Sequence, residues 1–352
     1  MGHRFRIAEI VTDTGDIRAL RLLKQVGVDE AVGVLPRGFS DWRMHRSDDP
    51  WSYGSLASLK RYLSEFGLKL VAIEDNPPMD RIRYGIEGRE EELENVLRMI
   101  ENMGKLGISV WCYNWMAGTG WVRSRTSVTT RGGALTTAFH LEDMEDYPPP
   151  SLGKVGSERL WETLEWFLDR VVPVAEEAGV NLAMHPDDPP IPSLRGVARI
   201  MNSVDAFRKL LRINGSPRNG ITLCQGNFTL MTDDLPSVIR ELVPSGRVFF
   251  VHFRDVRGSA ADFEETFIDQ GRTDMAECMR AYFDTGFSGI MRTDHTPTLY
   301  GDSASVPGYS ILGRLHAIGY IQGLIAATKS SSRPGSLDAA GEDESMAGNK
   351  QV

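Results

Sequence analysis

The sequence has few cysteines and no long apolar run, and both absences narrow the class of protein. Only Cys112, Cys224 and Cys278 occur among its 352 residues, and their spacing forms no repeat. Such a sparse, odd set argues against a disulfide framework and favours a reducing compartment. No stretch approaches the roughly eighteen apolar residues of a membrane-spanning helix, and residues 1–10 lack the apolar core of a signal peptide. We therefore expect a soluble, cytoplasmic protein without a membrane partner.

Positive charge is also scarce. Lys+Arg total 39 against Asp+Glu 48, a formal net charge of -9 at pH 7. A surface with this balance repels phosphate backbones, so we expect no nucleic-acid partner. Hydrophobic residues form 41% of the chain, which is ample for one large core, and the length suits a single α/β barrel better than two unrelated domains.

Short β-branched runs alternate with longer amphipathic stretches. The expected strands are Arg6–Val11, Glu30–Val34, Lys69–Ile73, Ser109–Tyr113, Asn181–Met184, Gly220–Cys224, Val248–Phe253 and Gly289–Arg292. The expected helices are Ile17–Gln25, Ser55–Phe66, Glu90–Leu106, Glu158–Ala178, Val204–Leu211, Leu235–Leu242, Asp274–Thr285 and Tyr309–Thr328. Several of these helices are followed by glycine, the usual helix terminator. Eight βα units in series predict an α/β fold, a parallel (β/α)8 TIM barrel with right-handed crossovers.

Two segments interrupt this alternation. Residues 114–157 separate the fourth strand from its helix by about forty residues, far more than an ordinary βα loop. Such loops usually cover a site or build an interface, so a homo-oligomer is one interpretation. Residues 330–352 are rich in Ser, Gly, Asp and Glu, which predicts a disordered tail. We predict one barrel domain over residues 1–329, including the insertion 114–157, followed by this tail.

A side chain of a type that binds metals stands at or just after the end of each of four consecutive strands. The fifth to eighth strands deliver, in order, His185, Cys224, His252 and Asp294. Each residue alone has an ordinary explanation, such as a core histidine, an inert buried cysteine or a helix cap. The C-terminal strand ends of an α/β barrel, however, meet at one rim where reactive groups collect. The shared position of the four residues therefore favours one site for a divalent metal.

The donor types limit the metal without selecting one. Two imidazoles, a thiolate and a carboxylate suit Zn(II), Fe(II), Co(II) or Ni(II), and the carboxylate also suits Mn(II). Four protein ligands could close a structural zinc site, but nearby polar groups favour a catalytic ion. Arg254 follows the seventh strand, Arg292 and His295 flank Asp294, and Tyr309 opens the last helix. An arginine there suits a carboxylate substrate, although an internal ion pair would also explain Arg292, and packing would explain Tyr309.

Six short motifs follow one another along the chain. They are CYN at residues 112–114, HPDDPP at 185–190, LCQG at 223–226, DM at 274–275, MRxDH at 291–295 and PGYS at 307–310. Together they resemble the mannonate dehydratase family, within the xylose-isomerase-like barrels. The HPDDPP run is the most specific of them. The resemblance is close over roughly residues 158–328 and looser over the N-terminal half.

The resemblance implies a metal-dependent dehydratase, typically using Mn(II), that removes water from a sugar acid. Its reaction converts D-mannonate to 2-keto-3-deoxy-D-gluconate. The implied metal ligands are His185, Cys224, His252 and Asp294. His295 and Tyr309 fall on the family's acid/base positions, and the chemistry allows either order.

We expect Arg292, Asn114 and Arg254 to bind the substrate, with Arg37 and Arg123 as further candidates for its carboxylate. The substrate-facing loops depart from the family pattern. FEETFID at residues 263–269 has no histidine where the family has Phe-His-Glu, and GVLP at residues 33–36 replaces a histidine pair. These departures leave the identity of the sugar acid open.

Other functions are compatible with the same pattern. A sugar isomerase or epimerase on this barrel would use a metal but keep every substrate atom. A phosphoesterase or nuclease would need a carboxylate-rich metal cluster and a basic face, which the charge balance disfavours. A sugar-acid binder without turnover is the third alternative. Dehydration leads because an acid/base pair accompanies the four ligands.

Overall fold

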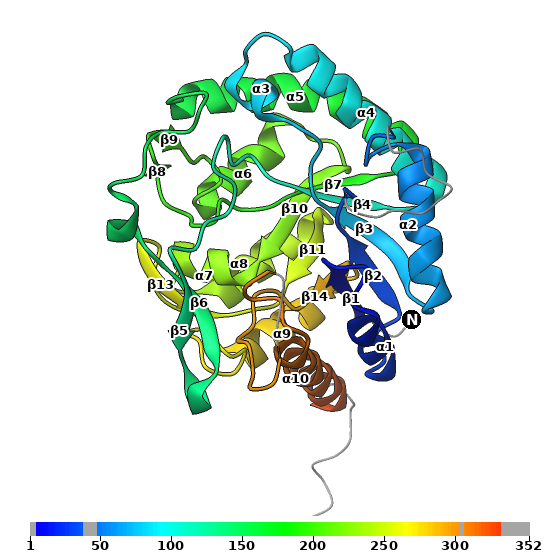
Figure 1. Cartoon of the computed structure of the whole chain (residues 1–352), viewed down its shortest axis with the longest axis vertical. Helices are drawn as coiled ribbons and strands as arrows, with labels where there is room; N and C mark the ends of the chain where they lie inside the picture. Colours follow the sequence, from blue (N-terminus) through cyan, green and yellow to red (C-terminus); the bar gives the residue numbers. More distant parts are fainter. Residues whose placement is uncertain (1–4, 38–47, 303–305, 332–352) are drawn as a thin grey trace, which may run out of the picture.

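The computed structural model is a closed barrel of eight parallel strands in the order β1-β14-β11-β10-β7-β4-β3-β2 (Figure 1). It describes residues 5–37, 48–302 and 306–331. The barrel strands are β1 (Arg6–Val11), β2 (Glu30–Gly33), β3 (Lys69–Glu74), β4 (Val110–Tyr113), β7 (Asn181–Met184), β10 (Asn219–Cys224), β11 (Val248–His252) and β14 (Ile290–Arg292). The predicted (β/α)8 barrel is confirmed, and every predicted strand end lies within one residue of the observed one.

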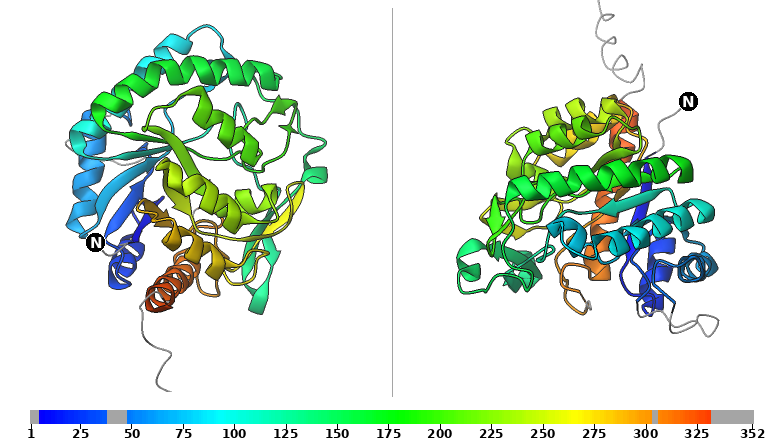
Figure 2. Two further views of the ribbon diagram at one scale, coloured as in Figure 1. Left: turned by 180° about the vertical axis from the view of Figure 1, so that it is seen from behind. Right: turned by 90° about the horizontal axis from the view of Figure 1, so that it is seen from above.

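Helices surround the barrel, as both views in Figure 2 show. They are α1 (Ile17–Gln25), α2 (Tyr53–Glu65), α4 (Arg89–Leu106), α5 (Ser157–Ala178), α6 (Val204–Ile213), α8 (Leu235–Leu242), α9 (Met275–Asp284) and α10 (Ile311–Ser331). The short helices α3 (Asp80–Tyr84) and α7 (Gln225–Met231) were not predicted. Within the described ranges, no helix has both the length and the apolar character needed to cross a bilayer.

The helices pack on the barrel through one apolar face each. In α5 the buried side chains include Leu160, Leu164, Phe167 and Val171, which recur at helical spacing. The ring of Phe167 contacts Trp111 on β4. Burying each such side chain stabilises the fold by about 1.5–3 kcal/mol relative to exposure.

The predicted start of the last helix at Tyr309 is wrong, because α10 begins at Ile311. Gly308 has a φ of 88°, a left-handed conformation that a residue with a side chain rarely adopts. The backbone therefore turns just before the helix and leaves Tyr309 in the loop at the rim. The tail predicted at residues 330–352 lies outside the described residues from 332 onward.

The insertion after β4 forms ordered structure. It contains the strands β5 (Arg125–Thr129) and β6 (Leu135–His140). These pair with the hairpin β12 (Val256–Ser259) and β13 (Asp262–Glu265), which follows β11, in a four-stranded antiparallel sheet. The sheet lies at the lower left of Figure 1, where β5, β6 and β13 are labelled. Pairing with β13 ties the insertion to the same rim that carries the predicted ligands.

Gly104 offers a test of how closely α4 and α5 pack. A Cβ at Gly104 would lie 2.5 Å from the carbonyl oxygen of Ala178 and 2.8 Å from its Cβ. We expect Gly104→Ala to lower the free energy of unfolding by about 1–3 kcal/mol, because the two helices must separate. Urea unfolding followed by circular dichroism measures this change.

Gly323→Ala on α10 is the matched control, since nothing lies within 4 Å of a Cβ there. It should be neutral or raise the free energy of unfolding by up to about 1 kcal/mol, through helix propensity alone. Equal stability of the two variants would contradict the close packing of α4 on α5.

Candidate active site

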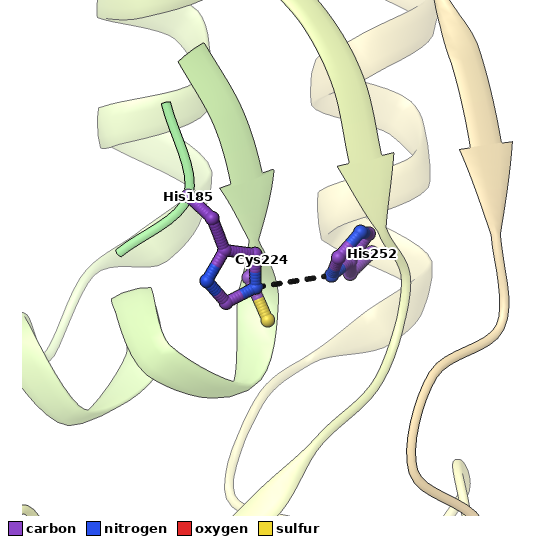
Figure 3. A group of neighbouring side chains, drawn as sticks. All are labelled: His185, Cys224 and His252. Carbon is purple, nitrogen blue, oxygen red and sulfur yellow. Dashed lines mark hydrogen bonds between the residues drawn. The ribbon is translucent and has the colours of Figure 1, made fainter. Parts of the chain in front are cut away.

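The four predicted ligands converge at the C-terminal rim of the barrel. Nitrogen or sulfur atoms of His185, Cys224 and His252 all lie within 4.8 Å of one another (Figure 3). His185 Nε2 is 3.2 Å from His252 Nδ1. Asp294 Oδ2 is 3.5 Å from Cys224 Sγ and 3.5 Å from His252 Nδ1. The strand register explains the convergence, because Cys224 pairs with His252, and His252 pairs with Arg292, two residues before Asp294.

The donor set fits a divalent metal in both spacing and chemistry. Donor atoms about 2.0–2.3 Å from one tetrahedral ion lie about 3.3–3.7 Å from each other, close to the separations here. The Pro186 carbonyl can only accept, so His185 Nδ1 donates to it at 2.7 Å. His185 Nε2 therefore keeps its lone pair and points into the cluster, as a metal ligand requires.

Charge around the cluster keeps two donors anionic. Burial alone would raise the pKa of the Cys224 thiol, but the Arg254 guanidinium and hydrogen bonds to the histidines lower it to about 6. Burial likewise opposes ionisation of Asp294, yet the cationic groups around it, above all Arg292, hold the pKa of that carboxyl well below its usual range. A thiolate and a carboxylate are thus available near neutral pH.

Arg254 and Arg292 lie behind the cluster, bound to carboxylates. Arg254 Nε donates to Asp294 Oδ2 at 2.6 Å, and its Nη1 donates to Glu265 at 2.8 Å. Arg292 binds Glu74 through two hydrogen bonds of 2.9 and 2.6 Å and lies 3.0 Å from Asp294 Oδ1. Both arginines are almost fully buried and neither lines the cavity described next. Direct contact between either arginine and a substrate stays a prediction.

A cavity of about 390 Å³ opens in front of the cluster. Its walls include the predicted residues Asn114, His185, Asp294, His295 and Tyr309. Arg37 also lines it and is half-exposed beside Asp75. The cavity could hold a small polar molecule beside the predicted ligands.

His295 and Tyr309 stand side by side on the cavity wall. Their rings meet edge to face, with centroids 5.1 Å apart. Tyr309 donates its hydroxyl hydrogen to Asp294 Oδ1 at 3.1 Å, and His295 Nε2 is 3.8 Å from the same oxygen. Burial and the Asp294 carboxylate raise the pKa of the Tyr309 phenol well above its usual value. The phenol therefore keeps its proton at neutral pH.

The HPDDPP motif anchors this rim. Asp187 Oδ2 accepts from the Met201 amide at 2.7 Å. Asp188 accepts from Arg123 at 2.6 and 2.9 Å and from Arg254 at 3.1 Å. The motif thus ties the segment after β7 both to the insertion and to the arginine behind the ligands.

Sequence reasoning missed three parts of the site. Trp121 of the insertion packs on the His295 ring, with centroids 5.0 Å apart. Glu265 on β13 contacts His295 Nδ1 at 3.0 Å, and Glu74 lies 3.3 Å from His252 Nε2. Trp121 carried a weak signal, a tryptophan in an unusually long loop. Glu265 lies in the FEETFID segment that departs from the family pattern, whereas nothing in the sequence distinguished Glu74 from other glutamates.

Comparison with solved structures supports the fold. A xylose isomerase-like TIM barrel protein from Mycobacterium smegmatis matches with a TM-score of 0.57 at 14% identity, over 93% of this chain and 98% of that one. An L-ribulose 3-epimerase matches with a TM-score of 0.60 at 15% identity, over 94% and 97%. At these identities the likeness establishes the fold alone, a (β/α)8 barrel.

The family model described as D-mannonate dehydratase (UxuA) matches residues 12–155 and 150–334. The chain belongs to the mannonate dehydratase family, a family of hydro-lyases. The mannonate dehydratase of Enterococcus faecalis is 32% identical, over 90% of this chain and 95% of that protein. The mannonate dehydratase of Thermotoga maritima is 31% identical, over 88% and 93%. The crystal structure of mannonate dehydratase from Streptococcus suis serotype 2 matches with a TM-score of 0.84 at 28% identity, over 94% and 96%.

The buried ion pairs of Asp188 predict a large stability effect. Asp188→Asn leaves Arg123 and Arg254 short of one carboxylate in a buried network. We expect the free energy of unfolding at neutral pH to fall by about 3–5 kcal/mol. Glu142→Gln is the control, because Glu142 is exposed and lies 3.8 Å from Arg125, so chemical denaturation should detect almost no change.

The same variant should change the response to acid. Burial opposes ionisation of Asp188, but Arg123 and Arg254 outweigh it and hold its pKa below the usual range. A carboxyl with a depressed folded-state pKa stabilises the fold above its unfolded pKa, about 3.9, and this stabilisation disappears as pH falls. Asp188→Asn should therefore lose stability less steeply below that pH than the natural chain. Parallel acid unfolding curves would contradict this role.

Proposed function

We propose that the chain is a metal-dependent dehydratase that removes water from a sugar acid, converting D-mannonate or a close relative to its 2-keto-3-deoxy product. One observation carries the proposal. The Tyr309 phenol and the His295 imidazole line one small cavity, next to Asp294 and a cluster of His185, Cys224 and His252, side chains of types that bind metals. Membership in the mannonate dehydratase family supports the same chemistry.

We propose that the metal is held by His185, Cys224, His252 and Asp294. Mn(II) is our first choice from the family resemblance, with Fe(II), Co(II) and Zn(II) as alternatives. When bound, such an ion would act as a Lewis acid that stabilises negative charge developing on substrate oxygens. Arg254 and Arg292 neutralise Asp294 from behind and hold its carboxylate in place.

His295 and Tyr309 would carry out the proton transfers of the reaction. Elimination removes a proton from the carbon next to the carboxylate and expels a hydroxyl group from the adjacent carbon. One side chain takes that proton and another protonates the departing hydroxyl. The two rings share the cavity wall, so both can reach adjacent carbons of one substrate. We propose that Asn114, which also lines the cavity, contacts the substrate.

We also propose a cytoplasmic location and no nucleic-acid partner. All three cysteines are buried and free of disulfides, which suits a reducing compartment. The net charge of -9 disfavours nucleic acid. A homo-oligomer built through the insertion stays a prediction.

Turnover is tested with purified protein, Mn(II) and D-mannonate, followed by mass analysis of the product. We expect loss of one water, whereas an unchanged mass would identify an isomerase or epimerase. Tyr309→Phe should lower kcat by about 10²–10⁴-fold while metal content stays constant. The fully exposed Tyr300 provides the control Tyr300→Phe, which should keep natural activity. Metal-loaded protein that turns over no acid in a broad aldonate panel would refute dehydration.

Metal binding is tested separately from turnover. We expect Cys224→Ser to weaken Mn(II) binding by more than about 100-fold, since loss of a ligand should cost at least as much as loss of a group that supports one. Isothermal titration calorimetry measures the affinity. Cys278→Ala, a buried position on α9, is the control and should bind Mn(II) like the natural chain. Equal affinity in Cys224→Ser would remove Cys224 from the ligand set.

A further inference from the structure

Glu265 and the insertion together determine how the His295 ring is held. Glu265 is buried at the end of β13, in the FEETFID segment that lacks the histidine of the family's Phe-His-Glu. Its Oε1 atom is 3.0 Å from His295 Nδ1. Burial opposes ionisation of Glu265, but Arg254 and Arg123 outweigh it and keep the pKa of this carboxyl below its usual value. An ionised carboxylate can only accept hydrogen bonds.

Arg123 also approaches His295, with Nη2 3.1 Å from Nδ1, so it competes with Glu265 for that atom. The guanidinium has five N–H groups, and carboxylates or a carbonyl take all of them. Nε donates to Glu265, Nη1 donates to Val122 O and Asp188, and Nη2 donates to Asp188 and Glu265. No N–H of Arg123 is left for His295, so Nδ1 carries the hydrogen and donates it to Glu265.

The other ring nitrogen then has no hydrogen in the neutral imidazole. His295 lines the cavity, and its Nε2 is 3.8 Å from Asp294 Oδ1. A carboxylate in contact with Nδ1–H both orients the ring and stabilises it when Nε2 gains a proton. Trp121 packs on the ring and limits its rotation.

We propose that Glu265 is a positioning residue that holds His295 in the Nδ1–H tautomer, with Nε2 as the proton acceptor of the reaction. Arg123, from the insertion, holds Glu265 in turn. This inference rests on the proposed function for its catalytic meaning, and it assigns the base to His295 and the acid to Tyr309. It also gives the insertion a role, because without Arg123 the carboxylate would lose one of its two arginine partners.

The tautomer can be measured without any turnover. Long-range ¹H–¹⁵N correlation spectra of the ¹⁵N-labelled full chain, loaded with diamagnetic Zn(II), separate protonated from unprotonated ring nitrogens. The spectrum of His295→Asn identifies the His295 signals. At mildly alkaline pH we expect Nδ1 protonated and Nε2 unprotonated. A spectrum with the hydrogen on Nε2 would overturn the proposal, whether or not a sugar acid is turned over.

Glu265→Gln then tests the consequence for catalysis. We expect kcat to fall about 10–100-fold with little change in KM, because the lost interaction supports the reacting side chain rather than substrate binding. Glu264→Gln makes the same charge change one residue away, where Glu264 pairs with exposed Arg257, and should keep the natural kcat. Metal content, measured by mass spectrometry, should stay the same in both variants.

A folded, metal-loaded Glu265→Gln variant with natural kcat would overturn the positioning role. If this variant does not fold, the tautomer measured in the natural chain decides. Failure of the proposed function is distinguishable, since it would appear as absent turnover in the natural chain while the His295 tautomer is still observed.

Discussion

The ion pairs between Asp294 and two buried arginines connect every part of the candidate site. Asp294 offers Oδ2 to Arg254 at 2.6 Å and lies 3.0 Å from Arg292 through Oδ1. Each arginine also forms an ion pair with a second carboxylate. Arg254 pairs with Glu265, and Arg292 pairs with Glu74. Removing one member of such a network leaves an uncompensated buried charge, which costs more than the whole network contributes. The network therefore constrains the rim as a single unit.

This constraint explains how segments far apart in the sequence meet at one cavity. Arg254 forms ion pairs with Glu265 on the hairpin strand β13 and with Asp188 in the HPDDPP segment. Arg123 brings the insertion onto the same two carboxylates. The antiparallel pairing of β6 with β13 supports that contact through the backbone. The insertion is consequently part of the site, and its Trp121 covers the His295 ring.

The division between metal cluster and acid/base pair also follows from this arrangement. The proposed anionic donors Cys224 and Asp294 lie in front of the buried arginines. His295 and Tyr309 lie at the edge of this cluster, where Asp294 Oδ1 is within reach of both. One carboxylate thus borders both regions. A metal bound at the proposed site would therefore be coupled to the proposed proton-transfer groups through the two oxygens of Asp294.

Much of this architecture follows from short-range patterns in the sequence. Alternating strand and helix patterns determined the barrel. The convergence of His185, Cys224, His252 and Asp294 followed from their places at four successive strand ends, because the C-terminal ends of the parallel strands meet at one rim. Only the tertiary structure decided the rest. The partners of Arg254 and Arg292, the antiparallel sheet of the insertion and the contact of Glu265 with His295 join residues up to 218 positions apart. Such pairs leave no periodic pattern, since any acidic residue could be the partner until the backbone brings one within hydrogen-bond distance.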